Sequence, residues 1–183
     1  MQSEKDASEM QDKINVVEDA YGKSIVVVND IQFKGKQHIN WDAVEKYLKE
    51  YVGHCYEIHE TSEKIYIGPD FPGEFKGSDD TTRLRGGNAK AKANATQQIP
   101  LLLRNATNKR WSENFKDKHN VDAKHGWCRY TSRFALPIYA NDGKIEKYNM
   151  YRIEMLARMA SDGKIYLYDM VNVKKEKETE YPA

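Results

Sequence analysis

The chain lacks the features that mark several large classes of protein. It has only 2 cysteines and 5 prolines in 183 residues, and no apolar run approaches the roughly 18 residues that a membrane helix needs. Cys55 and Cys128 lie far apart and match no metal-ligand spacing, so reduced thiols are expected, with a disulfide as the alternative. The polar, acidic N-terminus does not resemble a signal peptide. We therefore expect a cytoplasmic protein that makes no contact with a membrane.

The motifs of the common enzyme classes are missing as well. The sequence contains no G-x-S-x-G, Walker A, H-E-x-x-H or C-x-x-C motif. His119, Asp122 and His125 have a spacing from which a metal site could be drawn, but no other ligand cluster supports one. We therefore expect neither a metal nor a cofactor.

Charge is unevenly distributed along the chain, although the net charge is only +1. Residues 1–80 hold 9 Lys and Arg against 17 Asp and Glu, a balance of −8, whereas residues 81–133 hold 12 against 3, a balance of +9. A basic middle segment favours a polyanionic partner such as nucleic acid or an acidic protein surface. The alternative is that the acidic and basic segments face each other in the fold.

Hydrophobic periodicity predicts an α+β fold in which helices pack on an antiparallel β-sheet. We expect short strands at 24–29, 54–58 and 64–67, a helix over 41–51 capped by Asn40, a long loop at 68–80, a helix over 88–106 interrupted by Pro100, and a loop or short helix over 108–120. Three longer strands follow at 127–139, 145–158 and 164–173, joined by turns at Asn141–Gly143 and Ser161–Gly163. This pattern is a C-terminal three-strand meander.

These elements predict four parts of the chain. They are a flexible N-terminal tail (1–21), an N-terminal α/β subdomain (22–80), a helix plus β-meander domain (81–173) and a disordered charged tail (174–183).

One face of the predicted meander is rich in polar and aromatic side chains. Alternation places Cys128, Phe134 and their even-numbered neighbours on an apolar face, and the odd-numbered residues on the opposite face. The same rule groups Ile165, Leu167 and Val171 on the apolar side of the third strand. The polar face gathers guanidinium groups, aromatics and one carboxylate, next to two histidines. A solvated edge strand whose arginines pair with carboxylates is the alternative interpretation.

These residue types are the ones that cleave RNA without a metal. The reaction needs a base for the 2′-hydroxyl proton, an acid for the leaving 5′-oxygen, and cations for the phosphoryl charge. Arg129 and Arg133, on either side of Thr131, would project about 7 Å apart in succession and hold the scissile phosphate and its neighbour. His119 or His125 would be the acid, and Glu154 or the other histidine the base. The candidate catalytic residues are His119, Lys124, His125, Arg129, Arg133, Glu154 and Tyr168; the candidate substrate-binding residues are Arg85, Lys90, Lys92, Trp127, Thr131, Arg152 and Tyr166.

Four segments carry a resemblance to a known group of proteins. IYIGPDFPGEF, LRGGNAKAKANATQQIP, KHNVDAKHGWCRYTSRFALPIY and DGKIYLYDMVNVKKE are similar to C-terminal modules of large polyvalent proteins of Firmicutes phages and integrative elements. Those modules are grouped with the barnase–EndoU–colicin E5/D–RelE-like (BECR) nucleases. The resemblance implies helices on a four-stranded antiparallel sheet with the site on its open face, and a toxin-like, metal-independent ribonuclease.

The resemblance also implies partners. These are RNA, with tRNA as one candidate, and a cognate immunity protein or host target. The rival hypothesis is a non-catalytic interaction module that inhibits a host protein or binds nucleic acid, since no single compact catalytic motif is present.

Overall fold

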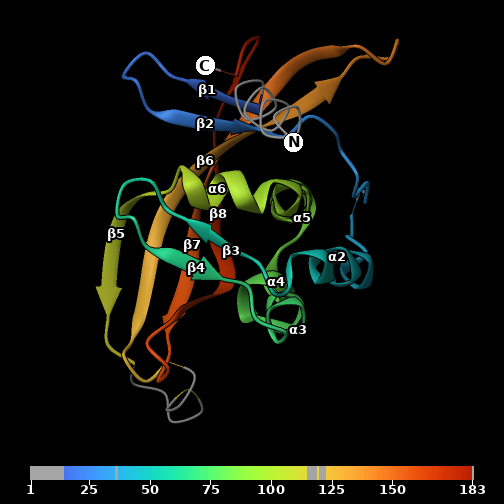
Figure 1. Cartoon of the computed structure of the whole chain (residues 1–183). Coiled ribbons are helices and arrows are strands. Elements are labelled where there is room, and N and C mark those ends of the chain that lie inside the picture. The colour runs from blue at the N-terminus through green and yellow to red at the C-terminus, as the bar shows by residue number, and fades with distance from the viewer. Residues whose placement is uncertain (1–14, 36, 115–118, 120–122, 183) are drawn as a thin grey trace, which may run out of the picture.

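A meander of three long strands forms the centre of the molecule (Figure 1). In the computed structural model, which describes residues 15–35, 37–114, 119 and 123–182, these strands are β6 (Trp127–Tyr139), β7 (Ile145–Met159) and β8 (Ile165–Thr179). β6 pairs antiparallel with β7, and β7 with β8. Gly143 and Gly163 adopt the positive φ values that these tight turns require. The predicted strands and turns are confirmed.

Shorter strands extend the meander at both edges into one eight-stranded sheet. These are β1 (Val16–Glu18), β2 (Ser24–Val27), β3 (Cys55–Glu57), β4 (Lys64–Tyr66) and β5 (Thr107–Ser112). The order is β1-β2-β6-β7-β8-β4-β3, and β5 pairs with the first half of β6. β2 joins β6, and β4 joins β8, in parallel. The sheet is therefore mixed rather than wholly antiparallel, and residues 22–80 share it instead of forming a sheet of their own.

The helices follow local sequence signals. They are α2 (Trp41–Leu48), α3 (Phe71–Gly77), α4 (Asp79–Arg83), α5 (Gly86–Ala95) and α6 (Ile99–Arg104), with the 3-10 helices η1 (Lys49–Tyr51) and η2 (Thr96–Gln98). The Asn40 side chain accepts a hydrogen bond from the Ala43 N–H and caps α2, as predicted. The single helix predicted over 88–106 is α5, η2 and α6 in succession, with Pro100 in the first turn of α6.

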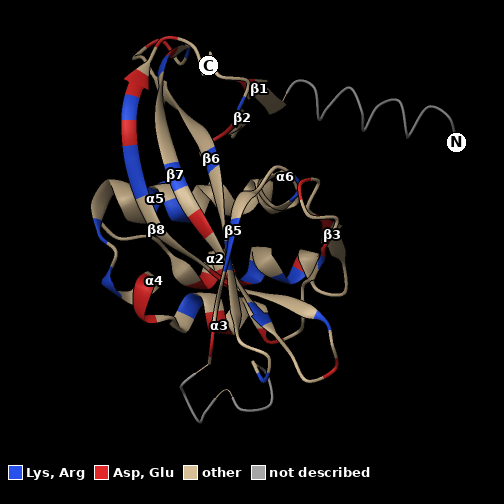
Figure 2. Cartoon of the chain, turned by 90° about the vertical axis from the view of Figure 1, so that its left-hand side faces the viewer, with Lys and Arg blue, Asp and Glu red and all other residues tan. Residues whose placement is uncertain are grey.

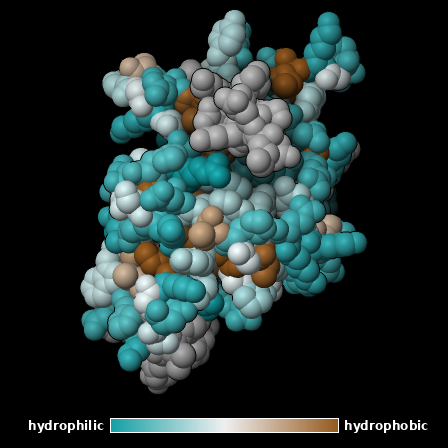
Figure 3. Space-filling model, in the orientation of Figure 1, coloured by the Kyte–Doolittle hydropathy of each residue, from teal (hydrophilic) through white to brown (hydrophobic). Residues whose placement is uncertain are grey.

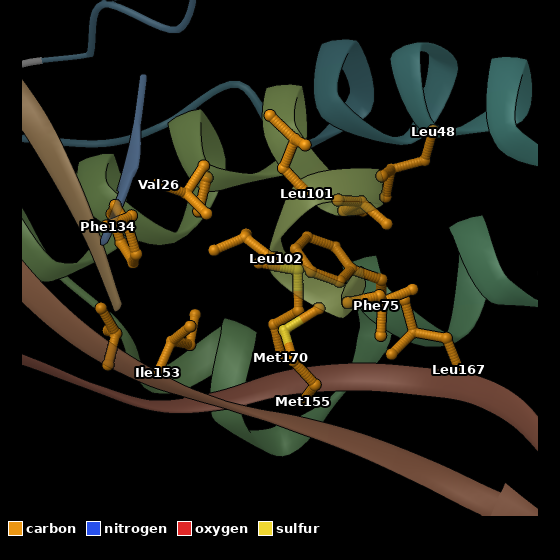
Figure 4. Close-up of a cluster of buried hydrophobic side chains, with 14 of the residues drawn as sticks. Val26, Leu48, Phe75, Leu101, Leu102, Phe134, Ile153, Met155, Leu167 and Met170 are labelled. Atoms are coloured by element: carbon orange, nitrogen blue, oxygen red, sulfur yellow. The ribbon is translucent and has the colours of Figure 1, made fainter. Parts of the chain in front are cut away.

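Helices and sheet enclose one main core (Figure 4). Leu102 of α6 packs with Phe134, Ile153 and Leu167 of the meander, and Phe75 of α3 lies beside them. α6 contacts both β3 and β6 because the sheet curls around it. This packing confirms the predicted placement of the 88–106 segment on the apolar face of the meander.

The predicted loop at 68–80 is instead helical. Pro72 occupies the first turn of α3, where its missing N–H costs no hydrogen bond. Phe71 and Phe75, four residues apart, are both buried on the core side of α3. The Ser78 side chain then accepts a hydrogen bond from the Thr81 N–H and caps α4. The segment was predicted to be a loop because its glycines, prolines and acidic residues are typical of loops, although Phe71 and Phe75 have helical spacing.

The two predicted tails also contribute to the sheet. β8 continues to Thr179, where it pairs with Tyr148 of β7, so the charged segment after residue 173 is mostly strand rather than disordered. Within the predicted N-terminal tail, Val16–Glu18 forms β1, and residues 1–14 lie outside the described part of the chain. Pairing with a neighbouring strand therefore orders segments whose composition alone favours disorder.

The surface is polar. In the view of Figure 3 the hydrophobic side chains form separate small spots among hydrophilic ones. Among the described residues, no helix is both long and apolar enough to cross a membrane. The two cysteines are free thiols: Cys55 is exposed and Cys128 is buried.

Candidate nucleic-acid site on the open sheet face

The helix-free face of β6 and β7 carries the polar residues that alternation predicts. Trp127, Arg129, Thr131 and Arg133 are each partly exposed, whereas the residues between them are buried. Glu154 of β7 lies directly opposite Thr131 in the register. Figure 2 shows basic and acidic bands close together along β7 and β8 on this side of the molecule.

Glu154 is the centre of a hydrogen-bonded group, here named the Glu154 cluster. The cluster consists of Arg110, Arg129, Thr131, Glu154 and Asn172. Arg110 Nη2 donates to Glu154 Oε1 at 3.0 Å, and Arg129 Nη1 donates to Oε2 at 2.9 Å. Asn172 Nδ2 also donates to Oε2, at 2.6 Å, and Arg110 Nη1 donates to the Thr131 hydroxyl at 3.1 Å. One carboxylate therefore orients two guanidinium groups that come from neighbouring strands.

The cluster keeps Glu154 ionised. Partial burial alone would raise the pKa of its carboxyl group, but the hydrogen bonds from Asn172 and Arg129 and the charges of Arg129 and Arg110 outweigh burial. The pKa of Glu154 is therefore lower than the ordinary glutamate value. The carboxylate is therefore in the ionised form that a general base needs before it takes a proton.

Beside the Glu154 cluster lie three aromatic rings, here named the aromatic trio: His119, Trp127 and Tyr168. The His119 ring meets Trp127 edge-on with a centroid distance of 5.0 Å, and meets Tyr168 edge-on at 5.5 Å. Trp127 and Tyr168 are 5.0 Å apart in the same manner. Asn114 donates to the His119 carbonyl oxygen and accepts from the Trp127 indole N–H. His119 is thus buried against the sheet, with its imidazole among aromatic rings.

Arg129 of the Glu154 cluster and all three rings of the aromatic trio line one hollow of about 400 Å³. Glu154 does not line the hollow itself but is hydrogen-bonded to Arg129, which does. Val171 and Leu156 add apolar side chains to its lining. The rim carries further polar and acidic groups: Ser78, Asp79, Asp80, Ser112, Glu113, Asn114 and Asp169. The hollow brings together residues from five separate parts of the chain.

An irregularity in β8 places Val171 in this hollow. The register between β7 and β8 shifts between Leu156 and Ala157, so that Val171 lies opposite Glu154 on the open face. Met170 and Val173 take the core positions instead. The prediction that Val171 shares the apolar face with Leu167 is therefore wrong, because a bulge reverses the alternation.

Arg133 is placed away from the Glu154 cluster and is held by two carboxylates. Its Nη1 lies 2.6 Å from Asp19 Oδ2, and its Nε lies 3.1 Å from Glu176 Oε1. Arg152 is exposed on β7 directly opposite Arg133. The predicted partnership of Arg129 and Arg133 on successive phosphates is therefore replaced by two separate ion-pair groups on one strand.

The other predicted residues next to β6 are exposed at its start. Lys124 and His125 lie in the turn before β6, and the His125 carbonyl oxygen accepts a hydrogen bond from the indole of Trp111. Neither residue lines the hollow. Asp122, which stands between the two histidines in the spacing noted above, lies outside the described residues.

Four predicted substrate-binding residues lie elsewhere. Arg85 is exposed and donates to the carbonyl oxygens of residues 82 and 84. Lys90 lines a second hollow of about 920 Å³ near the start of α5. Tyr166 donates to Asp162 and stacks against Arg158. Lys92 is fully buried, so its ammonium group is not available to a substrate.

Acidic and basic segments do face each other, as the second interpretation of the charge pattern expects. Asp19, Glu63 and Asp80 from the acidic N-terminal part pair with Arg133, Lys109 and Lys92 from the basic middle segment. Much of the positive charge of the middle segment is thereby neutralised within the fold.

Sequence reasoning missed two members of the Glu154 cluster. Arg110 belongs to β5, which was expected to be a loop or a short helix, because its sequence TNKRWS has no alternation of apolar and polar residues. Asn172 was counted as an ordinary strand residue, but its φ of +56° is in the left-handed region. Asparagine in the middle of a strand is itself a signal, because it tolerates that region better than most residues.

No family model, no curated protein and no solved structure matches the chain. Functional inference therefore depends on the chemistry of the open sheet face.

Proposed function

We propose that the chain is a metal-independent RNA endonuclease whose active site is the hollow between the Glu154 cluster and the aromatic trio. One observation carries the proposal: the Arg129 guanidinium group and the His119 imidazole line the same hollow, and the ionised Glu154 carboxylate joins Arg129 to a second guanidinium group, that of Arg110. These are the base, the cations and the acid that cleavage of RNA at its own 2′-hydroxyl requires.

Each group has a defined task in this reaction. Glu154 takes the proton from the 2′-hydroxyl as its oxygen forms a bond to phosphorus. Arg129 and Arg110 stabilise the negative charge that builds on the phosphoryl oxygens, since guanidinium groups bind such oxygens in a bidentate manner. His119, in its protonated form, donates a proton to the departing 5′-oxygen as the bond from phosphorus to that oxygen breaks. The products are a 2′,3′-cyclic phosphate and a free 5′-hydroxyl.

The aromatic trio adds a reason to expect single-stranded RNA. Trp127 and Tyr168 present rings at the hollow, and unpaired bases stack on such rings with little regard to sequence. A position on an open sheet face is also what the resemblance to BECR nucleases implies. In this chain the base would be Glu154 and the main phosphate-binding residue Arg129.

A second function is favoured by a different observation. Arg110, Arg129 and Arg133 each already pair with a carboxylate, and an interaction module could use such a face without catalysis. The partner of such a module would be a host protein or a nucleic acid. Binding without cleavage is the result that would distinguish this function from the first.

The test is cleavage of total bacterial RNA by the purified chain, with and without EDTA. We expect cleavage by the wild type, no effect of EDTA, and a loss of about two orders of magnitude or more in Glu154→Gln, because the amide cannot accept the proton. Glu176→Gln is the matched control, since it removes a partly exposed carboxylate that pairs with Arg133. Activity abolished by EDTA, or equal activity in the wild type and Glu154→Gln, would refute the mechanism.

A further inference from the structure

Asn172 interrupts β8 next to the proposed base. Its φ of +56° is rare for a residue with a side chain, and the register shifts at this point, so that Arg152 pairs with Lys174 and Glu154 with Val171. The backbone is thereby turned so that the Asn172 side chain lies over the open face. Its Nδ2 donates to Glu154 Oε2 at 2.6 Å, which is shorter than either guanidinium contact to Glu154.

A hydrogen bond from its own N–H to Asp80 holds the backbone of Asn172 in this conformation. The N–H of Asn172 donates to Asp80 Oδ1 at 3.2 Å, and the second oxygen of Asp80 lies 2.8 Å from Lys92 Nζ. Lys92 is fully buried and also pairs with Asp169 at 2.9 Å. A buried lysine that is fixed by two aspartates and buried helix packing is a rigid support. The support extends from α5 through α4 to Asn172 and ends at the Glu154 carboxylate.

We infer that Asn172 is a positioning residue for Glu154 in the proposed ribonuclease, an inference that depends on the proposed function. The charged groups that face Glu154 are Arg110 from β5 and Arg129 from β6, while Asp80 of α4 faces the backbone of Asn172. The amide of Asn172 is the neutral donor among them. It directs one carboxylate oxygen and favours the ionised form without adding a charge that would compete with the phosphate.

The test replaces Asn172 by glycine. Glycine adopts a positive φ without strain and keeps the N–H that Asp80 accepts, so Asn172→Gly removes only the amide contact to Glu154. Asn108→Gly is the matched control, because Asn108 of β5 also has a positive φ, of +57°, and lies on the same sheet. The N–H and carbonyl groups through which Asn108 bonds to Glu60 and Arg110 are retained in that variant.

The first readout does not require activity. Nuclear magnetic resonance titration of the Glu154 carboxyl group should show a higher pKa in Asn172→Gly than in the wild type, because a hydrogen bond to the charged form has been lost. The control should titrate like the wild type. Asn172→Asp provides a second variant: aspartate tolerates the same backbone, and its charge should raise the pKa of Glu154 as well. An unchanged Glu154 titration in both Asn172 variants would overturn the inference.

The second readout is the pH profile of RNA cleavage. The acidic limb should move to higher pH in Asn172→Gly, and cleavage on that limb should fall about tenfold, in keeping with one lost hydrogen bond to a charged group. A merely structural role would lower activity equally at all pH values, and that outcome would count against positioning. If the titration shifts but the wild type cleaves no RNA, Asn172 still fixes Glu154, and it is the proposed ribonuclease function that fails.

Discussion

Arg129 and Arg133 lie on the same face of β6, four residues apart, in very different surroundings. Arg129 shares a single carboxylate, Glu154, with a second arginine, and its side chain is 41% exposed beside the hollow. Arg133 is 19% exposed and is held between Asp19 and Glu176. Two cations share one carboxylate in the ion-pair group of Arg129, whereas two carboxylates share one cation in the ion-pair group of Arg133. The first ion-pair group therefore carries a net positive charge that suits a phosphate, and the second carries a net negative charge.

The difference shows that strand alternation predicts which face of the sheet a residue lies on, but not what the residue does there. Alternation alone places both arginines on the open face and makes them equivalent. The neighbouring strands distinguish them: β5 adds Arg110 to one end of the face, while the β1–β2 turn adds Asp19 to the other. An arginine next to a second cation is suited to binding an anion, and an arginine between two anions stabilises the fold.

The largest expected effect is on RNA cleavage. Arg129→Ala should reduce kcat/KM by about two orders of magnitude, the usual cost of removing a donor that stabilises transition-state charge. Arg129→Lys should restore only part of the activity, because an ammonium group cannot make the bidentate contact. Arg133→Ala, assayed in parallel on the same RNA, should stay within about threefold of the wild type. Equal losses in the two alanine variants would show that the arginines act together on the substrate after all.

The next effect is on the stability of the fold, where Arg133→Ala should have the larger effect and Arg129→Ala the smaller one. Arg133→Ala should lower the free energy of unfolding by about 1–2 kcal/mol, because it leaves two partly buried carboxylates without their partner. Arg129→Ala should cost less than about 1 kcal/mol, since its ion pair is more exposed. Urea unfolding at neutral pH measures both. A greater loss for Arg129→Ala would contradict the division of roles.

Acidification should remove the Arg133 effect. A backbone hydrogen bond from Lys23, followed by the bond from Arg133, lowers the pKa of Asp19 against the opposing effect of burial. A carboxyl group with a lowered pKa contributes its stability above the ordinary aspartate value and loses it as the pH falls through the folded value. The difference in unfolding free energy between the wild type and Arg133→Ala should therefore be constant from neutral pH down to mildly acidic pH, and should shrink below the ordinary aspartate range.

The smallest effect is the salt dependence of RNA binding. Only the cations around the hollow are expected to meet phosphates, so the log–log slope of affinity against salt should be about −1 to −2 for a single strand. If all 12 basic residues of the segment 81–133 took part, the slope would be near −8. Filter binding with Glu154→Gln, which is expected to bind without cleaving, measures it. A steep slope would show that the internal ion pairs open when RNA binds.

The sequence predicts the parts of this molecule whose structure depends on local pattern. The three long strands, their glycine turns and the capped helix α2 each show a strong local signal, and all are confirmed. The two parallel pairings of the sheet could not be predicted, because no local pattern specifies which strand joins an edge. The helices at 71–83 were hidden for a different reason: the phenylalanine spacing in α3 is surrounded by glycine, proline and acids that usually indicate a loop.

The sequence predicted the kinds of side chain that form the candidate site, but it did not predict all of the residues. Glu154, Arg129, His119, Trp127 and Tyr168 were all expected near one another from alternation and position. The structure brings four of them to one hollow and bonds the fifth, Glu154, to Arg129. Arg110 and Asn172 depend on a short edge strand and a bulge, and neither feature has a reliable sequence signal. Arg133 and Lys92 looked available because their carboxylate partners come from other parts of the chain. Asp19 and Glu176 lie 114 and 43 residues from Arg133, and Asp80 and Asp169 lie 12 and 77 residues from Lys92.

The parallel pairings at both edges of the sheet also determine the order in which the molecule can be assembled. Val26 pairs with Phe134, and Ile65 with Ile165, so each pair joins residues at least 100 positions apart. During synthesis, β2 and β4 leave the ribosome long before the strands that they will join. The meander, whose strands are linked by tight turns, can form from local contacts, whereas the edges must close across long loops. We therefore expect the N-terminal third to become fixed only after the last strand has emerged, which makes its unpaired strands the segments most in need of protection in a growing chain.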